Sequence, residues 1–128
     1  MISRLSRRPR LATFAMLLGA LFLAAGRAEA HAIILSSKPA ANSQVAQGPV
    51  DILLQFNSRI DIDHSRVSLV DPAGKVMALA AVEGSAPGSL TASGKTDAPG
   101  KWIIRWQALS LDGHITRGEI PFQVTPAP

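Results

Sequence analysis

The stretch from 101 to 109 alternates strictly between two faces, one of which is wholly apolar. That face carries Trp102, Ile104, Trp106 and Ala108. Successive side chains of a β-strand point to opposite sides of the sheet, so this pattern predicts a strand with one buried face. Residues 50–56 alternate in the same way, with Val50, Ile52, Leu54 and Phe56 on one side. Such a chain must bury one sheet face against another.

The remaining apolar runs are short and are separated by turn residues. We expect further strands over residues 32–35, 66–70, 75–82, 90–92 and 119–125, and a polar loop over 40–49. Asp71, Pro72 and Gly74 predict a hairpin turn between two of these strands. No stretch is convincing as an amphipathic helix. About seven short strands with frequent turns favour an all-β fold, an immunoglobulin-like antiparallel β-sandwich or Greek-key barrel.

The first thirty residues have the three parts of a secretory signal peptide. A basic start with four arginines precedes residues 11–26, which are uncharged, mostly apolar and short for a membrane span. Ala28-Glu29-Ala30 is an A-x-A cleavage site. We therefore predict a cleaved signal over 1–30 and one domain over 31–128, with no membrane span after cleavage. The general secretory route is favoured over twin-arginine export, and an uncleaved signal anchor is the alternative.

The leader also accounts for the basic composition of the chain. The formal net charge is +4, but the leader holds five arginines and one glutamate, whereas residues 31–128 hold eight basic and eight acidic residues. With neither a basic stripe nor a run of like charges, a nucleic-acid partner is not expected. Cysteine is absent, which excludes disulfides, thiolate chemistry and a blue-copper site.

Three residues form a candidate metal site. Cleavage after Ala30 would make His31 the first residue, offering its α-amine and its ring Nδ1 together. Asp112 and His114 flank Gly113, and in an extended backbone residues two apart face the same side, so both could approach one metal. A tight Asp-Gly hairpin turn is the alternative. Two imidazoles, an amine and a carboxylate suit tetragonal Cu(II), with affinity that falls in acid.

The third histidine has two interpretations. His64 follows Asp61 and Asp63 at polar alternate positions, and either carboxylate could complete a weak second metal site with it. The other interpretation is a solvated loop histidine. Met77 is the only methionine after the leader, and one thioether does not make a Cu(I) site.

Two stretches resemble the CopC family of periplasmic copper-binding proteins. One begins at His31 after the A-x-A site and continues with Ser-Ser-Lys-Pro-Ala over 36–40. The other runs from Trp106 to Gly118 and is similar to the family's closing pattern, S-x-D-G-H-P-x-x-G. Phe122-Gln123-Val124 also fits. The resemblance therefore covers nearly all of residues 31–128.

The resemblance implies an immunoglobulin-like β-domain that binds Cu(II) in the bacterial periplasm. Its ligands would be His31, Asp112 and His114. It further implies a role in copper resistance or supply as a carrier or buffer rather than an enzyme, often with a CopD-like inner-membrane partner. We expect a monomer.

Three departures from the family pattern qualify the resemblance. Residues 76–88 hold one methionine and no histidine, so a Cu(I) site is not expected. The stretch Phe56-Asn57-Ser58-Arg59 lacks the glutamate of some members, and Ile115 replaces the usual proline. Two other functions remain as alternatives: a small copper-brace oxidase of the lytic polysaccharide monooxygenase kind, and a metal-free interaction module.

Overall fold

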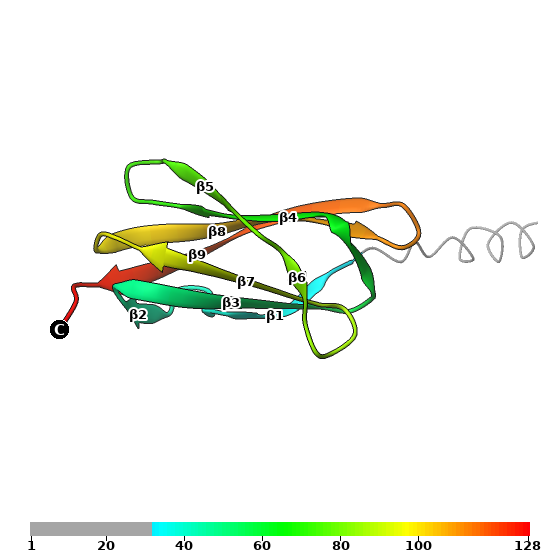
Figure 1. Ribbon diagram of the computed structural model, residues 1–128, viewed down its shortest axis with the longest axis horizontal. Helices are drawn as coiled ribbons and strands as arrows, with labels where there is room; N and C mark the ends of the chain where they lie inside the picture. Colours follow the sequence, from blue (N-terminus) through cyan, green and yellow to red (C-terminus); the bar gives the residue numbers. More distant parts are fainter. Residues whose placement is uncertain (1–31) are drawn as a thin grey trace, which may run out of the picture.

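Residues 32–128 form two β-sheets that pack face to face, as the computed structural model of the chain shows (Figure 1). The described part contains strands and turns but no helix. Its strands are β1 (Ile34–Lys38), β2 (Gln44–Ala46), β3 (Gly48–Phe56), β4 (Ile60–Val70), β5 (Val76–Leu79), β6 (Val82–Glu83), β7 (Ser89–Thr96), β8 (Gly100–Ser110) and β9 (Ile115–Thr125). The all-β sandwich expected from the sequence is confirmed.

The strand order is β1-β3-β7-β6 in the four-stranded sheet and β2-β9-β8-β4-β5 in the five-stranded sheet. Strand pairing is antiparallel except between β2 and β9, which run parallel. Two strands beyond the expected seven are the short β2 and β6. The prediction of a loop over 40–49 is wrong at 44–46 and at 48–49. Residues 44–46 pair with the edge of β9 in a segment too short to show alternation, and residues 48–49 begin β3, paired with β7.

Several strands extend beyond the runs predicted for them. Polar residues 36–38 continue β1, and β7 spans 89–96 instead of 90–92. Likewise β4 begins at Ile60 rather than Arg66, and its register with β8 shifts between Asp61 and Arg66. Backbone pairing with a neighbouring strand needs no apolar side chain, so these extensions carry no hydrophobic pattern. The predicted hairpin after Val70 is confirmed as β4–β5.

The alternating faces meet in one hydrophobic core between the two sheets. The four residues predicted to face inward on β8 are all buried, and the Trp106 ring meets the Phe56 ring of the opposite sheet edge-on, with centroids 5.1 Å apart. The core comprises Ala32, Val50, Ile52, Leu54, Phe56, Ile60, Val67, Leu69, Leu90, Ala92, Trp102, Ile104, Trp106, Ala108, Ile120, Phe122 and Val124. Burial of this core, rather than a disulfide, therefore accounts for much of the stability of this cysteine-free domain.

One end of the sandwich gathers segments from distant parts of the sequence. The start of β1, in cyan, and the β8–β9 turn, in orange, lie at the end opposite the C-terminus (Figure 1). In the described part of the chain, no helix is long and apolar enough to cross a membrane.

Candidate metal centre

The β8–β9 hairpin ends in a tight turn that carries Asp112 and His114. The Ser110 N–H donates to the His114 carbonyl and the Gly113 N–H to the Ser110 carbonyl, both at 2.9 Å. Gly113 has a φ of +92°, and a Cβ there would meet no atom within 4 Å. Its backbone conformation, rather than crowding, therefore favours glycine at this position.

The turn holds the Asp112 carboxylate in its ionised form. The Ser110 hydroxyl donates to Oδ1, as does the His114 backbone N–H at 3.2 Å. These hydrogen bonds, the one from Ser110 foremost, lower the pKa of Asp112 from 3.8 to about 2. Asp112 is consequently an anion throughout the neutral range, as a carboxylate metal ligand must be.

The imidazole of His114 lies against the same carboxylate. Its Nδ1 is 3.1 Å from Asp112 Oδ2, and the two side chains are 43% and 39% exposed. A carboxylate beside one ring nitrogen fixes the orientation of the ring, which is how histidine ligands are commonly held. Both side chains are thus partly open to solvent, whereas the Nδ1 atom itself is buried.

The backbone between these two residues is a turn, so the expectation of an extended segment is wrong. The Asp-Gly hairpin given as the alternative is the observed conformation. The side chains nevertheless come together, because the turn folds the chain back on itself and the Asp112 carboxylate accepts from the His114 N–H. The hairpin turn and the proximity of the two side chains are thus compatible.

The N-terminal end of the described chain is anchored close to this hairpin. Ala32 is 1% exposed, and its carbonyl accepts a hydrogen bond of 2.9 Å from the Thr116 hydroxyl on β9, two residues after His114. Ile33 and Asn57 exchange two further hydrogen bonds of 2.8 and 2.9 Å. The predicted signal peptide and His31 lie outside the described residues. Asp112 and His114 are therefore the two predicted ligands that the structure brings together.

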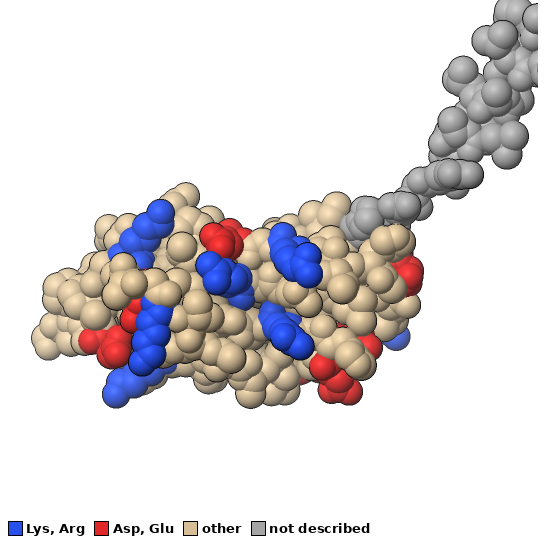
Figure 2. Space-filling model, turned by 90° about the horizontal axis from the view of Figure 1, so that it is seen from above, with Lys and Arg blue, Asp and Glu red and all other residues tan. Residues whose placement is uncertain are grey.

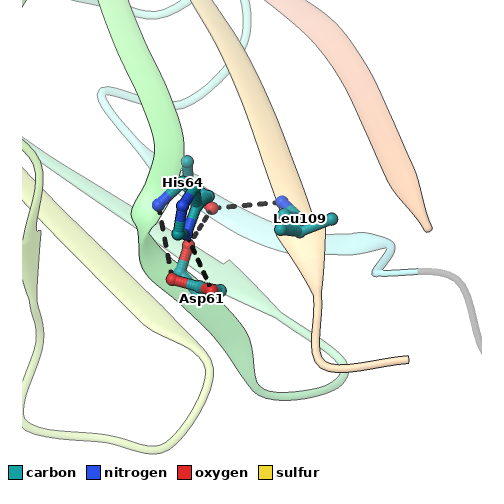
Figure 3. A network of polar contacts seen from close by, with 4 residues as sticks. Asp61, His64 and Leu109 are labelled. Atoms are coloured by element: carbon teal, nitrogen blue, oxygen red, sulfur yellow. Dashed lines mark hydrogen bonds and ion pairs between the residues drawn. The ribbon is translucent and has the colours of Figure 1, made fainter. Parts of the chain in front are cut away.

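Of its two candidate partners, His64 pairs with Asp61 (Figure 3). Its Nδ1 lies 3.0 Å from Asp61 Oδ2, and its side chain is 71% exposed. The Ser65 hydroxyl bridges from the Asp61 carbonyl at 2.6 Å to the Leu109 N–H at 3.1 Å, across the register shift between β4 and β8. His64 is solvated as expected, but it lies on a strand and not in a loop.

Within residues 32–128, no cluster of three or more histidine, aspartate or glutamate side chains could hold a metal ion. In this part of the chain His64 lies beside Asp61, and His114 lies beside Asp112. The sequence reasoning missed two residues that shape the candidate site, Ser110 and Thr116. For Ser110, the only indication in the sequence was its position in the S-x-D-G-H pattern. No local pattern could indicate that Thr116 bonds to Ala32.

Comparisons with known proteins give a matching family model and a similar curated protein. Residues 34–125 match the family model described as the CopC domain. The protein YobA of Escherichia coli K12 is 29% identical over 98 residues, which cover 74% of this chain and 79% of that protein.

Two solved structures are similar to this fold. CopC from Methylosinus trichosporium OB3b superposes with a TM-score of 0.70 at 29% identity, covering 77% of this chain and 97% of the other. PcoC, a methionine-rich copper resistance protein from Escherichia coli, gives a TM-score of 0.59 at 29% identity, covering 75% and 100%. The chain belongs to the CopC family, because the family model matches most of its length and these two structures superpose on its β-sandwich.

Proposed function

We propose that this chain is a periplasmic Cu(II)-binding protein that carries or buffers copper, with His31, Asp112 and His114 as ligands. The family and its copper resistance relatives support a copper-related role. One observation carries the more specific proposal: the ionised Asp112 carboxylate lies 3.1 Å from the His114 ring at an open turn. Copper is the cargo of such a protein, held in the oxidised state.

The donor atoms fit Cu(II). The described turn offers one imidazole and one carboxylate, and a mature N-terminal His31 would add its amine and Nδ1. That combination is rich in nitrogen and poor in sulfur, which favours Cu(II) over Cu(I). Because Nδ1 of His114 faces Asp112, we assign Nε2 of that ring to the metal. On reduction the ion would prefer softer ligands than these, so reduction favours its release.

The anchoring of Ala32 supports the participation of His31. Ala32 follows His31 in the sequence, and its carbonyl is bonded to Thr116, two residues after His114. A mature N-terminal His31 would be attached directly to this fixed residue, so folding already restricts the chain beside it and lowers the entropy cost of binding. By the same proposal the protein is a monomer, is exported by its signal peptide and meets a CopD-like inner-membrane partner.

The proposal is tested with two forms of the exported protein, one beginning at His31 and one retaining Ala30. In the second form the free amine belongs to Ala30, so His31 loses one of its two donor nitrogens. We expect the first form to bind one Cu(II) with a tetragonal, nitrogen-rich electron paramagnetic resonance spectrum. The second should compete at least about tenfold less well against a Cu(II) chelator.

Three outcomes would contradict the proposal. Equal Cu(II) affinities of the two forms would show that the α-amine of His31 is not a ligand. Copper that is lost under mild chelation would leave the metal-free interaction module as the better description. Sustained, reductant-dependent oxidation of chitin or cellulose would favour the copper-brace oxidase.

A further inference from the structure

The outer face of the five-stranded sheet carries a cluster of arginines that the copper proposal does not use. Strand register places Arg66, Gln107 and Arg117 side by side across β4, β8 and β9. The adjacent row is Ser68, Arg105 and Glu119. We call these six residues the arginine patch. Together with Trp106 and Gly118 they line an open hollow of about 460 Å³.

The charges of the patch are unbalanced. Arg105 Nε donates to Glu119 at 3.0 Å, and Arg117 Nε donates to the neutral Gln107 amide at 2.8 Å. Arg66 makes no side-chain hydrogen bond or ion pair with another described residue. Three guanidinium groups therefore share one carboxylate. Figure 2 views the molecule from the side of this sheet and shows blue side chains gathered over the middle of the face.

Spacing determines which anion the patch fits. Neighbouring strands lie about 5 Å apart and alternate residues of one strand about 7 Å apart, so the backbone positions of the three arginines spread over about 10 Å. A ligand with anionic groups distributed over a similar length matches these positions better than one small anion does. A single exposed ion pair is also weak in salt, and only a ligand with several linked anionic groups gains from the whole cluster.

The rest of the chain disfavours a polynucleotide or an anionic membrane. Residues 32–128 carry eight basic and eight acidic side chains, so no broad positive field surrounds the patch. Guanidinium groups bind a carboxylate or a phosphate through the same planar fork of donors, so the lack of a broad positive field, and not the fork, favours a short acidic segment. We propose that the arginine patch is a docking site for an acidic segment of a partner protein, which lies across β4, β8 and β9.

The test uses the exported protein without copper and a short oligoglutamate peptide, with an oligoglutamine peptide of equal length as the neutral probe. We expect oligoglutamate alone to shift the amide resonances of residues 66–68, 105–107 and 117–119. Its binding should weaken as the ionic strength rises from about 0.02 M to about 0.5 M. Because no metal is present, the result is independent of the proposed copper site.

Variants assign the binding to the patch. The pair Arg66→Gln and Arg117→Gln should weaken oligoglutamate binding about tenfold and leave the thermal unfolding midpoint nearly unchanged, since neither side chain packs in the core. Lys95→Gln on β7 of the other sheet removes an exposed charge elsewhere and is the matched control.

The proposal fails if oligoglutamate does not bind, or if Lys95→Gln weakens it as much as the arginine pair does. It also fails if inorganic phosphate binds as tightly as oligoglutamate, because the patch would then be a site for small anions. If the protein binds vesicles of anionic lipid more strongly than it binds the peptide, the partner of the patch is a membrane surface and not a protein.

Discussion

Asp112 illustrates how one side chain is prepared by its immediate neighbours. The Ser110 hydroxyl and the His114 N–H both donate to its Oδ1, and the His114 ring lies against its Oδ2. The first two contacts keep the carboxylate ionised, and the third orients the imidazole. In the proposed site Asp112 therefore acts as a ligand and also as the group that positions another ligand.

These roles predict an order of importance among the ligands. We expect Asp112→Ala to weaken Cu(II) binding less than His31→Ala, because the histidine contributes a ring nitrogen within a chelate whereas Asp112 contributes one oxygen. Competition with a Cu(II) chelator measures both variants. Equal losses would contradict the order, and Asp97→Ala, which removes an exposed carboxylate far from the turn in the sequence, is the control.

The pKa of Asp112 gives a second prediction at this scale. Because the folded-state pKa of about 2 lies below the ordinary 3.8, ionised Asp112 stabilises the fold above about pH 4, and this contribution is lost as the pH falls toward 2. Ser110→Ala should raise the pKa toward 3.8, measured by carboxyl-carbon NMR on the metal-free protein. Ser93→Ala, which removes a hydroxyl bonded to Asp51, should leave it unchanged. A pKa still near 2 in Ser110→Ala would refute the stated cause.

At the scale of elements, the β8–β9 hairpin combines a core strand with the candidate site. The Trp106 ring lies over Gly118, its partner across the hairpin. A Cβ at Gly118 would lie 2.5 Å from Cζ2 of that ring, which is buried and in contact with Phe56. The glycine is thus required by close packing, since its φ is not positive.

We therefore expect Gly118→Ala to reduce the free energy of unfolding by about 1–3 kcal/mol. Without the clash, the same change in an extended backbone would be stabilising, since it reduces the entropy of the unfolded chain. Urea unfolding measures the effect. Combining it with Trp106→Phe is the control, because the smaller ring should remove most of the additional loss. A stabilised Gly118→Ala variant would show that the ring can move aside.

At the scale of the whole molecule, the two sheets are joined at the end that carries the candidate site. The Thr116 hydroxyl on the five-stranded sheet bonds to the carbonyl of Ala32, just before β1 of the four-stranded sheet. Asn57, between β3 and β4, bonds to Ile33 from the other side. These contacts fix where the N-terminal segment enters the fold.

Thr116→Val should release this connection with little change in side-chain shape. The buried Ala32 carbonyl would lose its donor, at a cost of about 1–3 kcal/mol in unfolding free energy. Amide hydrogen exchange at Ile33 should become faster, and Cu(II) binding should weaken because the N-terminal segment is less ordered. Thr116→Ser keeps the hydroxyl and should behave like the unchanged protein. Unaltered exchange at Ile33 in Thr116→Val would refute the anchoring role.

The sequence alone determined the strands with one buried face and the types of residue at the candidate site. Alternation over 101–109 and 50–56 is local, because the two-residue period of a strand is the same wherever the strand lies in the sheet. The pattern around Asp112 and His114 likewise identified the family from neighbouring residues. The sequence did not predict short or edge strands such as β2. Backbone pairing holds them in the sheet, and it requires no alternation of apolar and polar side chains.

Only the tertiary structure decided which distant residues meet. Thr116 and Ala32 are 84 positions apart, and the arginine patch exists because the register of β4, β8 and β9 aligns three separate stretches. The turn at Gly113 was one of two backbone conformations that the sequence allowed, and the hydrogen bonds between Ser110 and His114 selected it. Strand order and register depend on how both sheets pack together, so no single segment contains the information that fixes them.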